Sequence, residues 1–267
     1  MNFVIAFPGE AQPIIDFYEL QKVGNQPFQN YQKDHFNLVI SGMGRKKTAQ
    51  AVDFLKTKNV SPNQAWMNLG IAGHGRMEIA KPFLAGKIED DLSENCFCPP
   101  QIYDHDFPVS CLKTCSQPCS CYEPELGYDM EAHAFYSSVI SVTTRELVQV
   151  IKIVSDNPTT SLKQFSPKDV PGLIEQNLKG IALLADQMEK ISIEMQLEPE
   201  ISNTFENVRD IHHFSSTRSH QLHDLIRQAN ALGLSLEEIV SIAKSAKSAA
   251  QAITSINEWM KPKRQLR

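Results

Sequence analysis

The sequence predicts an α/β domain followed by an all-helical C-terminal segment. Short apolar runs that end in glycine or small polar residues alternate with helical patterns over the first part of the chain, which is typical of an α/β sheet. From Gly172 onward, the apolar residues recur at helical spacing. A length of 267 residues fits one such domain with an extension. We therefore expect the α/β domain over residues 1–198 and the helical extension over residues 199–267.

The expected strands are short apolar runs, and each is followed by a turn that contains glycine or small polar residues. Ligand sites of α/β sheets lie in the loops at the carboxyl ends of the strands, so these turns are the first places to look for functional residues. In order, the expected strands and their turns are residues 3–7 with 8–9, 38–40 with 41–44, 66–69 with 70–73, and 147–154 with 155–157.

Helices are expected between and after these strands. A first helix should follow Pro13, a residue tolerated at a helix start. Residues 92–125 break the rhythm, since they hold five prolines and all six cysteines, and we expect a long loop or insertion there. The other expected helices span residues 46–56, open at 129–135, and run over 174–195 up to Pro199.

Charge and hydropathy exclude several classes of function. The formal net charge is −5, so no overall basic field exists to hold nucleic acid or anionic lipid. The apolar run before Pro8 is too short for a signal peptide core or a membrane span. We therefore expect a cytoplasmic protein without a membrane or nucleic-acid partner.

The cysteines crowd between Cys96 and Cys121. A reducing cytoplasm argues against a disulfide framework, and their spacing only partly matches the paired pattern of zinc ligands. Four histidines of the extension, from His212 to His223, have no evident carboxylate or cysteine partner and are interpreted as surface residues. We expect neither a metal nor another cofactor.

Three acidic residues lie where strands end or just beyond. Glu10 follows the first expected strand, Asp156 follows the last, and Glu131 opens the helix between them. Three carboxylates that a sheet brings together suit scission of a glycosidic bond. One protonates the leaving group, another activates water, and their negative charge favours an oxocarbenium-like transition state.

The residues around these acids resemble the nucleoside phosphorylase and nucleosidase superfamily, and most closely its methylthioadenosine/S-adenosylhomocysteine nucleosidase branch. The resemblance covers about residues 3–197 and implies a three-layer α/β/α domain with a mixed central sheet, in a homo-oligomer of at least two chains. Five motifs carry it in the family's order: Pro8-Gly9-Glu10-Ala11, Ser41-Gly42-Met43-Gly44-Arg45, Asn68-Leu69-Gly70-Ile71-Ala72-Gly73, Asp129-Met130-Glu131-Ala132 and Val154-Ser155-Asp156.

The resemblance implies catalytic roles for the acids. Asp156 would act as the general acid that donates a proton to purine N7, and Glu10 would orient and deprotonate the attacking water. Glu131 would accept hydrogen bonds from the ribose hydroxyls, and Met130 would pack against the sugar. Ser155 precedes the general acid and belongs to the same substrate-binding set.

The remaining candidate residues surround the substrate. Gly70, Ala72 and Gly73 would let the backbone approach the ligand closely, with Ile71 between them. Gly9, Arg45 and Asn68 are candidates for a water or phosphate site.

The sequence departs from the family pattern at Ile71, where serine is frequent, and at His74, where glycine is frequent. The segment expected to hold the base, about residues 112–118, falls in the cysteine-rich region.

Three functions remain open at this point, with hydrolysis favoured. Phosphorylases clamp phosphate with arginines, and only Arg45 and Arg76 lie near the candidate loops. We therefore expect hydrolysis of a purine nucleoside, a 5′-modified adenosine, with phosphorolysis as the alternative. A non-catalytic nucleoside-binding protein whose helical tail contacts a partner is the alternative from another class.

If the cysteines are loop residues without a metal, purified protein will contain far less than one zinc or iron atom per chain. Elemental analysis of the untagged protein measures this ratio. One tightly held metal per chain would contradict the interpretation.

Overall fold

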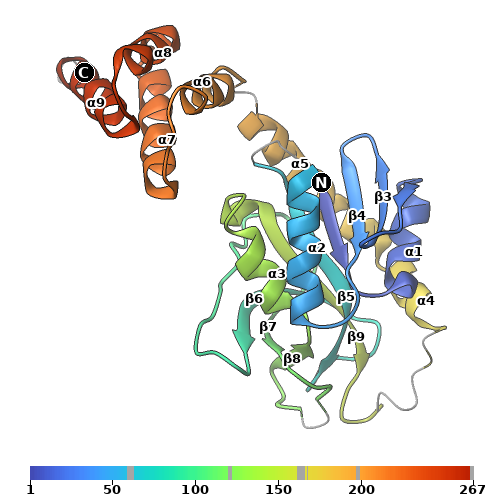
Figure 1. The fold of residues 1–267 in the computed structure, drawn as a ribbon. Helices are drawn as coiled ribbons and strands as arrows, with labels where there is room; N and C mark the ends of the chain where they lie inside the picture. The colour runs from blue at the N-terminus through green and yellow to red at the C-terminus, as the bar shows by residue number, and fades with distance from the viewer. Residues whose placement is uncertain (59–62, 120–121, 161–165, 167, 197–198, 265–267) are drawn as a thin grey trace. The chain divides into compact units, whose positions relative to one another are not determined.

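The structure is a computed structural model that describes residues 1–58, 63–119, 122–160, 166, 168–196 and 199–264 (Figure 1). The chain divides into two compact units, Met1–Met195 and Gln196–Arg267. The first unit contains the sheet and the second is helical.

The described strands of the first unit form one mixed sheet of nine strands. Their order across the sheet is β2-β3-β4-β1-β5-β8-β7-β6-β9, with both parallel and antiparallel neighbours. The prediction of an α/β domain with a mixed central sheet is confirmed. The strands are β1 (Asn2–Ile5), β2 (Gln21–Gly24), β3 (Gln29–Lys33), β4 (Phe36–Ile40), β5 (Trp66–His74), β6 (Pro82–Asp90), β7 (Val109–Thr114), β8 (Leu126–Asp129) and β9 (Val148–Asp156).

Strand β5 is the centre of the arrangement, because it pairs with β1, β8 and β9. Its long parallel register with β9 runs from Trp66 opposite Val148 to Gly73 opposite Asp156. Since β9 also pairs with β6, the strands β5, β8, β7, β6 and β9 form a closed circuit. The carboxyl ends of β1, β5 and β9 therefore meet at one end of the sheet.

Helices cover the sheet on both faces. Successive residues of a strand point to opposite faces, so alternate side chains of one strand pack against different helices. In β1, Phe3 and Ile5 join a core cluster with α1, α4 and α5, whereas Val4 joins a separate cluster with α2 and α3. Figure 1 shows α2 and α3 next to each other on their side of the sheet. The helices of this unit are α1 (Pro8–Phe17), α2 (Arg45–Lys58), α3 (Ala132–Val139), α4 (Val170–Glu175) and α5 (Leu178–Gln196), with a short 3-10 helix at Arg145–Leu147.

The first turn predicted from the sequence is wrong, because helix α1 begins at Pro8 rather than after Pro13. Proline fits the first helical position, where its missing N–H has no helical partner to lose. Glu10 then accepts a hydrogen bond from the backbone N–H of Phe7, the residue that caps the helix. Pro13 lies inside α1 and removes one internal hydrogen bond there.

Two other predicted turns are strand. Residues 70–73 continue β5 to His74, and β9 extends through Ser155 to Asp156. Both are held by the long β5–β9 pairing, whose register shifts between Ala72 and Gly73 without ending there. The candidate residues in these two segments therefore lie in strands rather than in loops.

The region 92–125, predicted as a loop, contains β7, which pairs with β6 and β8. The single helix expected over 174–195 is two helices, α4 and α5, with a break between Glu175 and Leu178.

The helical unit has a core of its own, to which Leu222, Ile226 and Ile256 contribute. Among the described residues, no helix is long and apolar enough to cross a membrane. The helices are α6 (Pro199–Arg209), α7 (Ser216–Ala231), α8 (Leu236–Ser245) and α9 (Ala249–Arg264).

The fold predicts a large difference between two leucine truncations. Leu38 is fully buried in β4, whereas Leu92 is 72% exposed. Leu38→Ala should lower the free energy of unfolding by about 2–5 kcal/mol, because it removes apolar contacts and leaves a cavity. Leu92→Ala should change it by less than about 0.5 kcal/mol. Denaturant titration of the full chain measures both, and equal losses would be inconsistent with the placement of β4 in the core.

Candidate active site

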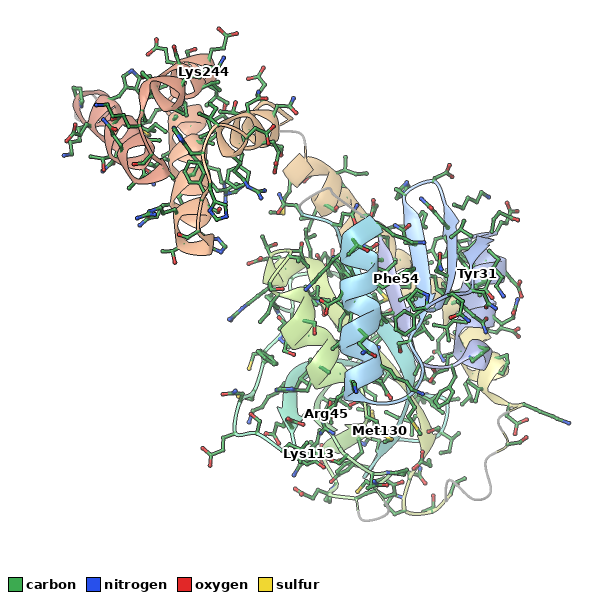
Figure 2. The ribbon with its side chains drawn as sticks, viewed as in Figure 1. Tyr31, Arg45, Phe54, Lys113, Met130 and Lys244 are labelled. Atoms are coloured by element: carbon green, nitrogen blue, oxygen red, sulfur yellow. The ribbon has the colours of Figure 1, made fainter. Side chains whose placement is uncertain are left out.

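A cavity of about 180 Å³ lies at the carboxyl ends of the central strands. Many of the residues proposed from the sequence line it: Glu10, Ile71, Ala72, Gly73, Met130, Glu131, Ser155 and Asp156. They come from α1, β5, the β8–α3 connection and β9, which are far apart in the sequence. The topology thus brings three candidate carboxylates to one cavity. Figure 2 shows Met130 at this end of the unit.

Glu10 is held by two backbone donors. Its Oε2 accepts from Phe7 N at 2.9 Å and its Oε1 accepts from Ile71 N at 2.9 Å. Burial raises the pKa of Glu10 to about 7, because the low-dielectric surroundings disfavour the charged form more than these hydrogen bonds and Lys152 favour it. The carboxyl group can therefore exchange a proton near neutral pH.

Gly70 explains how this carboxylate fits against β5. A side chain at Gly70 would place its Cβ 2.9 Å from Glu10 Oε1, a distance that real contacts do not allow. Glycine at this position therefore leaves room for the acid, although Gly70 itself does not line the cavity.

Glu131 lies at the N-terminus of α3, as predicted. Its Oε1 accepts from Gly44 N at 2.7 Å, which ties β8 to the turn before α2. Burial and the charge of Asp129 raise the pKa of Glu131, and Lys152 opposes this shift. The charge of Glu131 also raises the pKa of Glu10.

Lys152 is the cation of the site, and the sequence interpretation missed it. It is 1% exposed in the middle of β9, and its Nζ lies 2.9 Å from Asp129 Oδ2. Burial lowers the pKa of Lys152, but Asp129, Glu131 and Glu10 more than offset this, so its pKa is raised overall. A lysine inside the apolar run of β9 is the sequence signal that could have revealed it.

Asp129 connects Lys152 to the rest of the site. Its Oδ1 accepts from Thr114 Oγ1 at 2.7 Å, and its Oδ2 accepts from Ala132 N at 2.8 Å in the first turn of α3. The ion pair with Lys152 therefore also fixes the start of the helix that carries Glu131.

Asp156 is fully buried at the end of β9. Ser155 Oγ lies 2.5 Å from its Oδ1 and 3.3 Å from the carbonyl oxygen of Ala72, so this hydroxyl can donate to either. When it donates to Ala72, its oxygen can accept a hydrogen bond from a protonated Asp156 carboxyl group. Ser155 therefore suits both the ionised and the protonated carboxyl group.

Tyr122 is a second residue that the sequence interpretation missed. Its hydroxyl donates to Asp156 Oδ2, and its ring packs edge-on against Tyr128. Both tyrosines line the cavity. Tyr122 lies in the cysteine-rich region, where no periodic pattern indicates which side chains turn inward.

Three of the candidate residues for a water or phosphate site lie outside the cavity lining. Asn68 donates to the carbonyl oxygen of Val4 at 2.9 Å, and Gly9 lies in the first turn of α1. The guanidinium of Arg45 pairs with Asp90 and, at 2.5 Å, with Asp91.

His74, where the sequence departs from the family pattern, also does not line the cavity. Its Nε2 is 3.0 Å from Ser110 Oγ, and its Nδ1 accepts from the backbone N–H groups of Arg76 and Met77 at 3.1 Å. Burial lowers the pKa of His74, which agrees with a neutral ring that accepts these bonds.

Five of the six cysteines lie in the described part of the chain. Cys96, Cys98, Cys111 and Cys115 are free thiols, while Cys121 lies outside the described residues. Burial raises the pKa of Cys115 to about 11. No cluster of three or more histidine, cysteine or acidic ligands occurs within the described part of the chain.

Comparison with known proteins supports the fold at low sequence identity. No protein-family model matches the chain, and no curated protein is similar to it in sequence. The solved structures that share its fold include two nucleosidases and a hydrolase. The 5′-methylthioadenosine/S-adenosylhomocysteine nucleosidase of Neisseria meningitidis, in complex with methylthio-immucillin-A, is 14% identical at a TM-score of 0.56 and covers 68% of this chain and 97% of its own.

The second structure is the corresponding nucleosidase of S. pneumoniae with a transition-state inhibitor, which is 16% identical at a TM-score of 0.56 and covers 69% of this chain and 97% of its own. The third is the futalosine hydrolase of Helicobacter pylori, which is 12% identical at a TM-score of 0.54 and covers 70% of this chain and 97% of its own. The chain therefore shares the fold of these two nucleosidases and of the futalosine hydrolase.

The raised pKa of Glu10 predicts a pH-dependent effect of Glu10→Gln on stability. The folded chain holds the Glu10 proton up to about pH 7, whereas the unfolded chain releases it near 4.5. Wild-type stability therefore falls through this window as pH rises, and the glutamine variant lacks that loss. From pH 5 to pH 8 the variant should gain about 2–3 kcal/mol relative to wild type.

Urea unfolding at a series of pH values measures this difference. A stability difference that stays constant over the window would show that Glu10 titrates normally.

Proposed function

We propose that the protein hydrolyses the N-glycosidic bond of a purine nucleoside, a 5′-modified adenosine. The observation that carries the proposal is the convergence of Glu10, Glu131 and Asp156 on one cavity, each with different partners. Glu10 and Glu131 are buried close to the cation Lys152, whereas Asp156 has the hydroxyl groups of Ser155 and Tyr122 as partners. Such different environments suit separate roles as general base, general acid and electrostatic stabiliser.

Glu10 is the residue that activates water. With a pKa of about 7, a fraction of its carboxyl groups is ionised at neutral pH and can accept a proton from a water molecule. The water oxygen then attacks C1′ of the ribose, and its proton moves to Glu10. The two backbone donors at Phe7 and Ile71 hold the carboxylate in place during the transfer.

Asp156 is the residue that prepares the leaving group. Its proton moves to purine N7, and the electron pair of the C1′–N9 bond goes to N9, so the base leaves neutral. The resting contact of Tyr122 with Asp156 Oδ2 must give way to the base, because both need the same oxygen.

Glu131 and Lys152 set the charge around the ribose. Glu131 stabilises positive charge that develops at C1′ and accepts hydrogen bonds from the ribose hydroxyls. Lys152, behind it, favours ionised carboxylates in a buried site.

The phosphorolysis alternative needs a phosphate clamp. Arg45 is the arginine at the relevant turn, but its guanidinium is held by Asp90 and Asp91, and Arg76 pairs with Glu125 at 2.6 Å. These ion pairs favour hydrolysis.

Base release from adenosine, methylthioadenosine and 5′-deoxyadenosine, with and without phosphate, tests the proposal. Release that does not depend on phosphate supports hydrolysis. Release that requires phosphate favours phosphorolysis, and binding without turnover favours a nucleoside-binding protein; either result contradicts the proposal.

Asp156→Asn should lower kcat by about 10²–10⁴-fold, because the variant keeps the size of the side chain but cannot deliver a proton. KM should change far less, as for an interaction made mainly in the transition state. Glu10→Gln should also slow turnover, but through loss of water activation.

A substrate whose base leaves readily without protonation separates the two roles. It should restore turnover of Asp156→Asn substantially and of Glu10→Gln much less. Near wild-type turnover of adenosine-type substrates by Asp156→Asn would show that Asp156 is not the general acid.

A further inference from the structure

Tyr122 lies in the catalytic cavity, in contact with the proposed general acid. Its hydroxyl donates to Asp156 Oδ2, while Asp156 Oδ1 lies 2.5 Å from Ser155 Oγ. Within the described part of the chain, these two hydroxyl groups are the hydrogen-bond partners of the Asp156 side chain. Tyr122 therefore occupies the carboxylate oxygen that Ser155 leaves for another partner.

The Tyr122 ring fills space directly in front of this carboxylate. A Cβ built on Gly73 would lie 2.7 Å from Tyr122 Cε1, 3.1 Å from the Tyr122 hydroxyl oxygen and 2.9 Å from Asp156 Oδ2. The ring edge therefore lies against the backbone of Gly73, beside the end of β9. We call this arrangement, with the hydroxyl on Asp156 and the ring over Gly73, the closed position of Tyr122.

The size of the cavity agrees with a side chain that takes up part of it. Its volume is about 180 Å³, and Tyr122 is one of its lining residues. Pockets that enclose a small-molecule ligand commonly have volumes of about 300–1,000 Å³. A purine base in contact with Asp156 therefore needs some of the volume that Tyr122 fills in the closed position.

The backbone next to Tyr122 is fixed, so its side chain is the part that can move. Glu123 N donates to the Tyr128 hydroxyl oxygen at 2.9 Å, and a Cβ on Gly75 would lie 1.8 Å from the Glu123 carbonyl oxygen. This peptide group thus packs directly on Gly75. Tyr122 itself is half-buried, so rotation about its side-chain bonds can carry the ring away from Asp156 while these backbone contacts stay in place.

We propose that Tyr122 competes with the base for Asp156: the free protein holds the closed position, and a purine binds only after the ring has turned away. This inference rests on the proposed function, because that function places the base at Asp156. Every ligand that uses Asp156 then has its affinity lowered by the same factor, the fraction of molecules in which Tyr122 has left the closed position. Tyr122 limits the affinity of the site and does not hold the substrate.

Tyr122→Phe tests this proposal by the sign of its effect on binding. The variant keeps the ring but loses the hydrogen bond to Asp156, so the closed position is less populated. The test ligands are adenine and 9-deazaadenosine, a nucleoside whose C–C glycosidic bond cannot be hydrolysed. Their calorimetric Kd values should both fall by about ten- to a hundredfold, the range for a hydrogen bond to a charged group, and by the same factor. KM of a cleaved nucleoside should fall likewise, with kcat little changed.

Tyr136→Phe is the matched control. Tyr136 is a buried tyrosine that does not line the cavity, and its hydroxyl has no hydrogen-bond partner among the described residues. The Kd values of this variant should equal those of wild type. Tyr122→Ala removes the ring as well, so its Kd values should fall at least as far as those of Tyr122→Phe. In an Asp156→Asn background, Tyr122→Phe should change Kd less, because the hydroxyl then faces a neutral amide.

The outcomes separate this proposal from the proposed function. Kd values that rise, stay the same, or change by different factors for the two ligands in Tyr122→Phe would overturn the competition, and cleavage of nucleosides by wild type would still support the nucleosidase. Tighter binding of adenine to Tyr122→Phe, with no nucleoside cleaved by either protein, would support the competition and contradict hydrolysis. Failure of wild type and of both Tyr122 variants to bind adenine would overturn the competition.

Discussion

The site depends on the buried ion pair between Lys152 and Asp129. Three acidic side chains, Glu10, Asp129 and Glu131, gather where water is scarce, and their mutual repulsion would favour protonation or separation without a cation. Lys152 supplies that cation from the middle of β9. Removal of one partner of such a pair leaves an isolated buried charge, which costs about 3–5 kcal/mol.

The same pair links the charge of the site to its geometry. Asp129 holds the first turn of α3 through Ala132 and holds β7 through Thr114, so one carboxylate organises a strand end, a helix start and a neighbouring strand. Glu131, two residues after Asp129, accepts a hydrogen bond from the backbone N–H of Gly44 in the turn before α2. The strands β5 and β9, which carry Ile71 and Asp156, are paired from Trp66 opposite Val148 to Gly73 opposite Asp156.

Much of this arrangement could be predicted from the sequence, and the failures have physical reasons. The apolar runs around Leu38 and Val150 indicated strands because buried strands are continuously apolar. Strand β2 is largely exposed and β3 is half-buried, and both are mostly polar, so no such run marks them. Gly70 and Ala72 resembled a turn, since sequence alone does not show that a long parallel partner, β9, keeps them extended. Tyr122 was missed because its contact with Asp156 depends on the path of a region without periodicity.

The closed circuit of β5, β8, β7, β6 and β9 has a consequence for how the domain folds. Its closing pair joins residues 66–73 to residues 148–156, so a long segment must be looped out before these strands meet. Non-local parallel pairing of this kind is slow compared with the formation of local helices. Lys152, Ser155 and Asp156 all arrive with β9, the last strand along the chain. During synthesis on the ribosome, Glu10 and Glu131 therefore lack the positive charge of Lys152 until β9 has emerged. The proposed site is complete only after that strand has paired with β5.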